Sequence, residues 1–512
     1  MPHRDLDLEF SGQTFSFIDK KAQRSWTVYP FGWVLKAEES KINLDWEHSG
    51  WRWVDPQKVL DGGMDHDCVP KIKNSLQRVY LGPNGMFNTG DALIRRDNPA
   101  GQAFLEVMHK LKNDTENGAR ILATEALKGL VRILESFGAA PHESERYADH
   151  WHALRVTAYH FIHSARPAMN AAIAASVIDA LKAIAERLNH NGLQPRHAIQ
   201  AINTAISERT KTSAKIAGAF TSYVHHSLER HQDKDQKKEH ATRVINIITL
   251  SSSSTILSAL VDLFQSNAGI DSVVNLNILE SRPQCEGASL AASLLQRLKG
   301  HNSATSSQSS FKLNLKILPD SHVKFAINDL GPANPAQRDV CTFVLLGADR
   351  ITTSGHVVNK TGSAILADLS AGSGRQLRKI IVLSETDKIA APMLGRLPEY
   401  TQLMETHEED LADKLSRQEY NPSGGERHDA AEVYNAWSAK DQEVLVPHIN
   451  KTNKVGNVDV VLKVENLYFE HVPGHLIDAY ICETGEMSRE NILKKSVSRA
   501  QDDEKLFGNL YD

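Results

Sequence analysis

A run of hydroxyl side chains follows the apolar stretch RVINIIT. The run consists of Ser251, Ser252, Ser253, Ser254 and Thr255, and the helical sequence ILSALVDLF comes directly after it. Hydroxyl groups beside the free N–H groups of a helix N-terminus can bind an anion such as phosphate. A serine-rich turn whose hydroxyl caps the helix would explain the same residues without any ligand. The sequence therefore predicts an anion site, with a structural cap as the alternative.

Charged and amide side chains follow further apolar stretches. Arg282 comes after VVNLNIL in the sequence ESRP, and its guanidinium could bind a phosphate through two hydrogen bonds. An internal ion pair with Glu280 is the alternative. Asp349 follows CTFVLL in the sequence GADR, and a carboxylate in a cleft can act as a general acid or base. Asn359 and Lys360 could bind a second polar group of the same ligand.

The elements that must position these residues are apolar strands alternating with helices. The predicted strands are RVINIIT, VVNLNIL, VKFAI, CTFVLL and KIIVL. This alternation is typical of a parallel sheet with helices on both faces, in which a ligand lies outside the carboxyl ends of the strands. Asp329, after VKFAI, is a weaker candidate because a helix cap would explain it equally well. We expect Ser251, Arg282, Asp349 and Lys360 to surround one phosphorylated small molecule.

The composition divides the chain into three predicted domains. Residues 1–85 contain five of the seven tryptophans, and SWTVYPFGWVL and HSGWRWV alternate bulky and polar residues, which predicts a small β-rich module with an aromatic core. Residues 86–235 have the apolar spacing of helices and predict an all-helical domain. Residues 236–512 predict the α/β domain. Its charged stretch at about 387–457 is interpreted as a partly helical surface insertion, after which DVVLKV and LIDAYICETG resume the fold.

The bulk properties exclude several classes of protein. A formal net charge of −5 over 512 residues gives no basic surface for nucleic acid, and no apolar run reaches the roughly 18 residues of a membrane span. No GxGxxG or Walker sequence is present, and we expect neither a cofactor nor a metal ion. Cys68, Cys285, Cys341 and Cys482 are far apart, which indicates reduced thiols. With no secretory signal at MPHRDLDLEF, a cytoplasmic multidomain protein is expected.

Several of these motifs occur together in one superfamily. SSSST, ILESRPQCEG, FVLLGADRITTSGHVVNKTGS and VPGHLIDAYICETGE have the order and spacing of that superfamily. From about residue 90 the chain resembles the alpha, beta and delta regulatory subunits of eukaryotic translation initiation factor 2B. Relatives of these subunits are ribose-1,5-bisphosphate isomerase and methylthioribose-1-phosphate isomerase. NGAR and ARPAMN resemble the helical part of the family, which implies Gly118, Arg120 and Arg166 as ligand-binding residues.

The resemblance implies a helical domain followed by a Rossmann-like C-terminal domain. It also implies a homodimer or higher oligomer joined through the C-terminal domains, or assembly with other subunits of the initiation-factor-2B type. The isomerases of the superfamily transfer a proton or hydride between C1 and C2 of an aldose 1-phosphate. They use an aspartate in GAD, here Asp349, and a cysteine after the first strand, where this chain has Ser251.

The serine at the cysteine position bears on whether the protein is a catalyst or only binds a ligand. A serine hydroxyl has a pKa far above that of a thiol, so Ser251 cannot provide a comparable anion at neutral pH. Cys285, on the neighbouring loop, is a weaker substitute. Three functions stay open: a non-catalytic protein that binds a sugar phosphate or nucleotide, an aldose–ketose isomerase acting on a ribose- or methylthioribose-type 1-phosphate, and an interaction protein with no ligand.

Residues 1–85 also resemble the later part of a Nudix hydrolase domain. VYPFGWVLK and INLDWEHSGWRWVDPQKVL look like the closing strands and last helix of that fold. The Nudix box, a helix whose clustered glutamates bind magnesium, should precede these strands, and residues 1–25 do not supply it. We therefore expect a truncated Nudix-like module without a metal site or Nudix hydrolase activity, in which Glu47 is structural.

Overall fold

The computed structural model divides the chain into two compact units, residues 1–208 with 501–512 and residues 209–500. The predicted domain boundaries at residues 85/86 and 235/236 stay predictions. The structure describes residues 6–20, 23–36, 42–63, 68–82, 85–86, 93–114, 117–137, 147–164, 170–188, 193–230, 243–266, 272–299, 311–329, 340–372, 378–392, 396–421, 426–455 and 458–511.

The first unit begins with two antiparallel strand pairs, β1 with β4 and β2 with β3. The predicted aromatic core of residues 1–85 is wrong, because Trp26, Trp33, Trp46, Trp51 and Trp53 are all 42–91% exposed. The predicted strand at HSGWRWV is also wrong, since residues 48–54 form no strand. The small β elements have too little sheet to cover their aromatic faces. The elements of this part are β1 (Leu6–Ser11), β2 (Phe15–Asp19), β3 (Arg24–Val28), β4 (Phe31–Leu35), α1 (Pro56–Leu60), α2 (Ile72–Val79), β5 (Leu81–Gly82) and β6 (Gly85–Met86).

The helical prediction for the next part of the chain is confirmed. Leu122, Ala126, Leu130 and Ile133 of α4 are buried at three- and four-residue spacing, as expected for a helix with one face in a core. Gly129 lets α4 approach α3 closely, because a Cβ there would lie 2.7 Å from Val107 Cγ2. The helices are α3 (Pro99–Asn113), α4 (Ala119–Phe137), α5 (Tyr147–His163), α6 (Asn170–Ala185) and α7 (Pro195–Arg230), the last of which continues into the second unit.

The second unit contains a seven-stranded sheet in the order β18-β17-β13-β10-β7-β8-β9. All neighbouring strands are parallel except β18, which is antiparallel to β17. The strand order reverses between β7 and β10, where a doubly wound sheet binds its ligand. The predicted α/β fold is therefore confirmed. The strands are β7 (Arg243–Leu250), β8 (Ser272–Leu279), β9 (Phe311–Leu318), β10 (Val340–Leu346), β13 (Arg378–Leu383), β17 (Ala479–Cys482) and β18 (Gly485–Met487).

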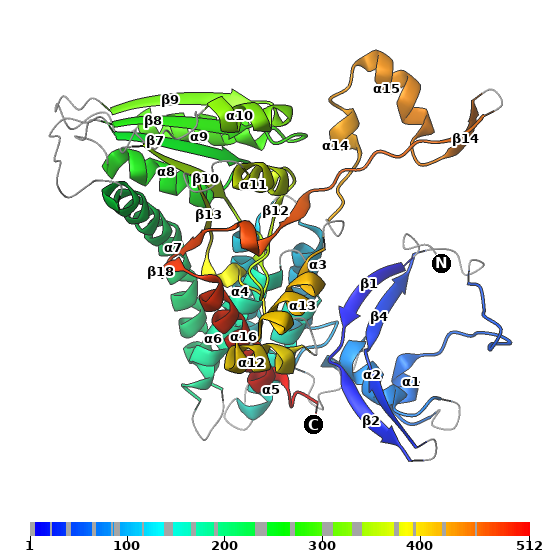
Figure 1. Ribbon diagram of the computed structural model, residues 1–512. Coiled ribbons are helices and arrows are strands. Elements are labelled where there is room, and N and C mark those ends of the chain that lie inside the picture. The colour runs from blue at the N-terminus through cyan, green and yellow to red at the C-terminus, as the bar shows by residue number, and fades with distance from the viewer. Residues whose placement is uncertain are drawn as a thin grey trace. The chain divides into compact units, whose positions relative to one another are not determined.

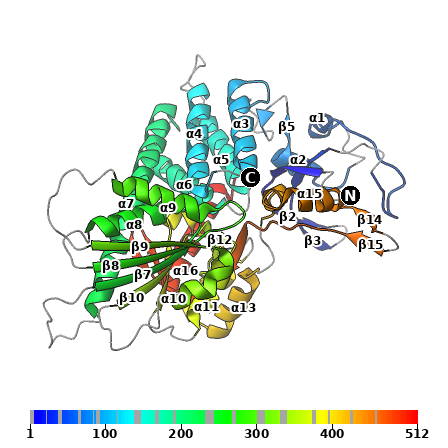
Figure 2. The same cartoon turned by 90° about the horizontal axis from the view of Figure 1, so that it is seen from above.

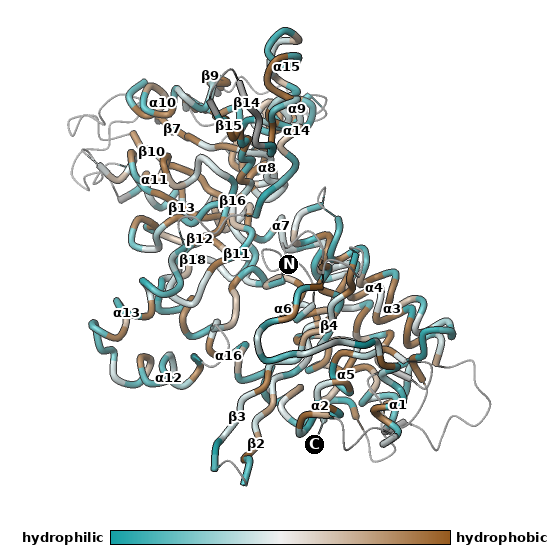
Figure 3. The backbone as a smooth tube through the Cα atoms, turned by 90° about the vertical axis from the view of Figure 1, so that its right-hand side faces the viewer, coloured by the Kyte–Doolittle hydropathy of each residue, from teal (hydrophilic) through white to brown (hydrophobic). Residues whose placement is uncertain are grey.

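Helices cover both faces of this sheet, as Figures 1 and 2 show. The second half of α7, with α8 and α9, packs on one face, and α10 and α11 pack on the other. Hydrophobic residues run through the strands between these layers, whereas α13 is largely hydrophilic (Figure 3). The covering helices are α8 (Ser254–Ser266), α9 (Glu286–Lys299), α10 (Val323–Asp329), α11 (Ser363–Ala371) and the beginning of α16 (Arg489–Phe507).

Two strand predictions for the second unit are wrong. VKFAI lies in α10, because Val323, Ala326 and Ile327 are its buried residues and have helical spacing. The sheet is extended instead by β9, whose Lys312 and Lys316 are exposed at the edge. DVVLKV does not resume the main sheet, since β15 (Val458–Val461) pairs only with β14 (Thr452–Val455) in a separate hairpin.

A ladder of amide side chains crosses the sheet on one face. Asn275 Nδ2 donates to Asn246 Oδ1 at 2.8 Å, and Asn314 Nδ2 donates to Asn275 Oδ1 at 2.8 Å. The three asparagines are register partners in β7, β8 and β9, and Asn246 also donates to Thr342 of β10 at 3.3 Å. Each hydrogen bond forms only when the strands are in this register, so the ladder specifies the alignment of four strands.

A small antiparallel sheet, β11-β12-β16, lies beside the carboxyl ends of the main strands. Helices α12 and α13 and an arm, defined here as residues 426–467, interrupt the chain between β13 and β16. Helices α14 and α15 of the arm contain no buried residue, and Figure 1 shows both in orange. These elements are β11 (Arg350–Ile351), β12 (Val357–Lys360), α12 (Leu397–Thr406), α13 (Glu409–Glu419), α14 (Ala431–Tyr434), α15 (Ala439–Leu445) and β16 (Phe469–Val472).

Candidate ligand site

The loops after β7 and β8 meet at the carboxyl edge of the main sheet. Ser251 N donates a hydrogen bond of 2.7 Å to Ser281 Oγ. Both serines have positive φ angles, 67° and 57°, which non-glycine residues adopt rarely. Gly287 brings α9 against the end of β8, since a Cβ there would lie 2.0 Å from Leu279 O. The local fold therefore holds two unusual turns together beside the reversal of strand order.

Glu286, in the first turn of α9, joins the serine loop to β12. Its Oε2 accepts a hydrogen bond of 2.6 Å from Ser251 Oγ, and its Oε1 lies 3.1 Å from Lys360 Nζ. The side chains of Glu286 and Lys360 are 23% and 21% exposed. The sequence prediction missed Glu286, although a carboxylate in the first turn of a helix that follows a strand-end loop is favourably placed. Its neighbours come from distant segments, which local sequence does not reveal.

A small pocket opens between these loops. It contains the predicted Arg282 and Lys360 together with Glu286, so two cations and one carboxylate share it. Its free volume is about 20 Å³, enough for about one water molecule. A sugar phosphate therefore requires side chains to move. The pocket is lined by Ser281, Arg282, Pro283, Gln284, Glu286, Lys360, Thr361, Leu467 and Tyr468.

The serine run caps a helix. Ser253 Oγ accepts a hydrogen bond of 3.3 Å from Ile256 N at the start of α8, as the structural alternative expects. Ser252 and Ser254 are exposed, and Thr255 is buried. The cap accounts for Ser253, and the predicted role of this run in anion binding stays a prediction.

Arg282 takes part in the ion pair that was considered as the alternative to phosphate binding. Its Nε lies 3.2 Å from Glu280 Oε2, and its side chain is 58% exposed. The backbone N–H groups of Ser281 and Arg282 donate to Asp320 at 2.8 and 2.7 Å, which fixes the loop. A guanidinium has five N–H donors, so an ion pair through Nε leaves donors for a ligand.

Asp349 lies where the main sheet meets β12. Its backbone N donates to Val358 O at 2.8 Å. Lys388, from the loop after β13, donates to the carbonyl oxygen of Ala348 at 2.5 Å, which brings an ammonium next to Asp349 along the chain. Asp349 is half-buried, and a carboxylate is a type of side chain that can act as a general acid or base.

Asn359 and Lys360 are on β12 of the small sheet, outside the main sheet. Asn359 is buried, and its Nδ2 donates to Ser363 Oγ at 2.8 Å. A Cβ on Gly347 would lie 3.4 Å from Asn359 Oδ1 and 3.8 Å from Ser253 Oγ. The small sheet thus places residues of the GAD and NK motifs next to the serine loop.

Helices α12 and α13 hold the loop that follows the GADR sequence. Glu419 accepts hydrogen bonds from Tyr400 Oη at 2.6 Å and from Ser354 N at 2.8 Å. Burial and the neighbouring Glu419 raise the pKa of Tyr400, which keeps the phenol protonated. His356 Nε2 donates to Ser416 O at 2.9 Å, and burial lowers the pKa of His356 and favours the neutral ring. The insertion therefore contributes structure next to the candidate site.

The remaining predicted site residues that the structure describes do not line the candidate pocket. Gly118 precedes α4 and Arg120 is in its first turn, in the first unit, while Arg166 falls outside the described residues. Their roles stay predictions. Burial and Glu280 raise the pKa of the Cys285 thiol, the opposite of what a nucleophilic cysteine requires. Asp329 is in an ion pair with Lys316 at 2.6 Å at the end of α10.

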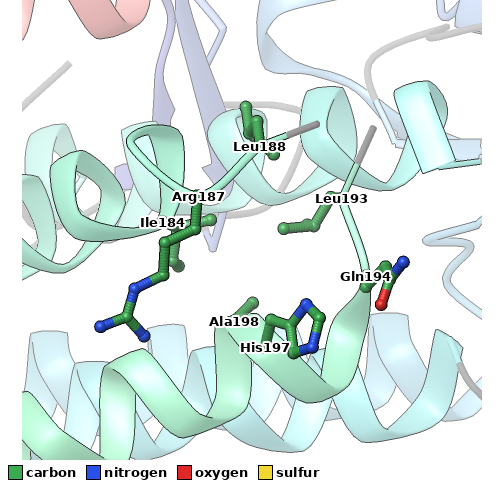
Figure 4. Close-up of a pocket in the computed structure, with 7 residues that line it drawn as sticks. All are labelled: Ile184, Arg187, Leu188, Leu193, Gln194, His197 and Ala198. Atoms are coloured by element: carbon green, nitrogen blue, oxygen red, sulfur yellow. The ribbon is translucent and has the colours of Figure 1, made fainter. Parts of the chain in front are cut away.

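A second pocket lies in the first unit, at the turn between α6 and α7 (Figure 4). Arg187 comes from just beyond α6 and His197 from the first turn of α7, and the pocket is also lined by Ile184, Leu188 and Leu193. Its free volume is about 10 Å³, and none of the predicted site residues lines it. This pocket therefore does not bear on the predicted chemistry.

Among the described residues, no three His, Cys, Asp or Glu side chains come together in a way that could hold a metal ion. None of the helices in the described ranges is long and apolar enough to cross a membrane. All four cysteines lie in the described ranges and are free of disulfide bonds.

A model of the Initiation factor 2 subunit family matches residues 115–489, more than half of the chain. The match begins after residues 1–85, so the Nudix resemblance of that part stays a prediction. No curated protein matches the chain.

Among solved structures, the chain is similar to a Pyrococcus horikoshii OT3 translation initiation factor eIF-2B, with 17% identity and a TM-score of 0.43 over 75% of this chain and 96% of that chain. It is similar to eIF2B beta from Chaetomium thermophilum, with 12% identity and a TM-score of 0.44 over 80% and 95%. It is also similar to 5-methylthioribose 1-phosphate isomerase from Pyrococcus horikoshii OT3, with 15% identity and a TM-score of 0.42 over 77% and 87%.

Proposed function

Because this chain belongs to the Initiation factor 2 subunit family, which matches residues 115–489, we propose that it binds a phosphorylated sugar or nucleotide without catalysing a reaction. One observation carries the proposal: Lys360 and Arg282 line the same pocket at the carboxyl edge of a doubly wound sheet. Ammonium and guanidinium groups are the side chains that bind phosphate best, and this edge is where such sheets bind ligands.

The surroundings of Ser251 support a non-catalytic role. Its hydroxyl donates to Glu286 Oε2 at 2.6 Å. Removing the serine proton would place an alkoxide beside a carboxylate, and a like charge at that distance disfavours ionisation. A serine in this position is therefore a poor acid–base group, although it remains a good hydrogen-bond donor to Glu286 or to a ligand.

Isomerisation of an aldose 1-phosphate is the second candidate, and the half-buried Asp349 favours it. In that function Asp349 would transfer the proton, and Arg282 and Lys360 would hold the phosphate. An Asp349→Asn variant distinguishes the two. It should abolish conversion of ribose 1,5-bisphosphate or methylthioribose 1-phosphate if the chain is an isomerase, and it should leave ligand affinity nearly unchanged if the chain only binds.

Binding is tested by thermal shift and calorimetry with pentose phosphates, hexose phosphates and nucleoside monophosphates. A ligand at about a hundred times its dissociation constant adds close to 2.7 kcal/mol of stability. Lys360→Ala should abolish the shift, while Lys324→Ala, which removes an exposed lysine of α10, should not. No shift with any phosphorylated compound would refute the proposal and favour an interaction protein without a ligand.

The family also leads us to propose how the protein assembles. We propose a cytoplasmic homodimer or higher oligomer joined through the C-terminal domain, with other subunits of the initiation-factor-2B type as alternative partners. Light scattering after size-exclusion chromatography measures the oligomeric state, and co-purification with tagged subunits tests the heteromeric alternative. A monomer that captures none of these subunits would contradict the proposed assembly.

A further inference from the structure

The ammonium group of Lys360 lies over an aromatic ring of the pocket wall. Nζ is 3.4 Å from the ring centre of Tyr468 and 5.2 Å from that of Phe469. The two rings are nearly perpendicular, at 77°, with centres 5.4 Å apart. A cation over the face of an aromatic ring is attracted by its negative quadrupole. Lys360 is therefore surrounded by two rings and by the carboxylate of Glu286.

The other face of the Tyr468 ring is covered by His428. The two rings are stacked, with centres 3.7 Å apart and an interplanar angle of 9°. Lys360 Nζ and the imidazole both lie within 4 Å of the same ring centre, so they must occupy opposite faces. The His428 side chain is only 6% exposed, and its Nε2 lies 2.8 Å from Glu426 Oε1. Tyr468 is thus held between an imidazole and an ammonium.

The backbone holds Tyr468 at the base of the arm. Its N–H donates to Glu426 O at 2.9 Å, and its carbonyl accepts from Thr361 N at 3.1 Å, next to Lys360. Asn466 Nδ2 donates to Asp429 O at 2.9 Å and closes the two ends of the arm on each other. The ring therefore links the arm to β12 through fixed contacts on both sides.

We propose that Tyr468 is a positioning residue of the candidate ligand site: its ring, backed by His428, holds the Lys360 ammonium at the pocket. The proposal deepens the proposed function and depends on it for the nature of the ligand. Lysine has a flexible four-carbon stem, and a lysine that is ordered only when ligand binds costs affinity. An ammonium that is already ordered over a rigid ring avoids that cost.

The position of Lys360 can be measured without any ligand. Lysines of the full chain are reductively methylated with ¹³C, and the Lys360 signal is assigned by its loss in Lys360→Arg. A ring current should shift this signal upfield in the wild type and in Tyr468→Phe, which keeps the ring. Tyr468→Leu should move it to the position of an exposed lysine. His428→Ala should reduce the shift and His428→Phe should preserve it. Tyr434→Leu, which removes an aromatic residue of the arm whose ring contacts Trp437, is the matched control.

Affinity is then measured by calorimetry with ribose 5-phosphate as the probe. Tyr468→Leu should weaken binding about two- to tenfold, the effect of ordering one lysine side chain on binding, and Tyr468→Phe should not. If the wild type binds no phosphorylated probe, the proposed function fails while the Lys360 signal still decides the positioning role. A Lys360 signal that is the same in the wild type and in both Tyr468→Leu and His428→Ala would overturn the proposal.

Discussion

Glu286→Gln removes a negative charge from the candidate site and preserves its shape. The carboxylate accepts from Ser251 Oγ at 2.6 Å and lies 3.1 Å from Lys360 Nζ. An amide oxygen can still accept the serine hydroxyl, so the loops should keep their arrangement. The ammonium, however, loses its carboxylate partner. We expect a phosphorylated ligand to bind the variant more tightly for two reasons. The ligand no longer competes with the Glu286 carboxylate for the Lys360 ammonium, and the carboxylate no longer repels the phosphate.

The magnitude follows from charge and distance. A phosphate bound to Lys360 opposite the carboxylate would lie about 6 Å from Glu286, since each contact to the ammonium spans about 3 Å. At that separation a carboxylate repels a doubly charged phosphate by about 1.4 kcal/mol in water and by about 5.5 kcal/mol at an effective dielectric constant of 20. Each 1.4 kcal/mol is a factor of about ten in affinity. Binding should therefore tighten at least about tenfold.

The assay is calorimetry with ribose 5-phosphate at pH 7 and low salt, repeated at high salt. The gain should shrink at high salt, because the pocket is partly exposed and its charges are screened. Glu409→Gln, at an exposed glutamate of α13, is the control for the change in net charge. Weaker binding by Glu286→Gln would refute the reasoning, since it would mean that Glu286 contacts the ligand favourably. Unchanged binding would place the phosphate elsewhere.

Three further predictions concern stability. Asn275→Leu should lower the free energy of unfolding by about 1–3 kcal/mol, because it breaks the middle of the amide ladder; an unchanged urea midpoint would contradict this. Gly287→Ala should lower the free energy of unfolding by about 3 kcal/mol, because the new Cβ would collide with Leu279 O. A melting temperature equal to that of the wild type would refute this prediction. Burial lowers the pKa of His160 to about 3, so the unfolded chain binds the extra proton between pH 6.5 and 3 and stability falls as the pH drops. His160→Leu should lose stability less steeply over that range in thermal melts; an equal slope would exclude His160 as the cause.

The sequence predicted the parallel sheet because its strands are continuous apolar runs, which local pattern reveals. VKFAI was mistaken for a strand because a five-residue apolar run does not separate the period of a helix from that of a strand. Strand β9 was missed for the opposite reason: Lys312 and Lys316, at the sheet edge, interrupt its apolar residues. The tryptophans of residues 1–85 were expected in a core because large aromatic side chains favour burial. The sequence pattern does not show whether enough neighbouring strands and helices are present to bury them.

The sequence could predict only those residues of the candidate site that lie at strand ends or in recognisable motifs. Ser251, Arg282 and Lys360 were named in advance. In the structure Glu286 contacts both Ser251 and Lys360, and Arg282 lines the same pocket as Lys360. Glu286 itself was not predicted, because its partners come from different loops. Tyr468 was missed since its contacts depend on the pairing of β12 with β16 and on His428, a histidine within the predicted insertion. Such contacts are set by tertiary structure and leave no local periodicity.

The asparagine ladder sets the distance between two residues of the candidate site, because it fixes the alignment of the strands that lead to them. Ser251 follows β7, and Glu286 follows β8 by way of a turn, so their separation depends on how those two strands are aligned. Sliding one strand by a single residue would displace its loop by about 3.3 Å, more than the 2.6 Å that separates the serine oxygen from the carboxylate. The asparagine side chains of β7 and β8 therefore determine the distance between the Ser251 hydroxyl and the Glu286 carboxylate without contacting either group.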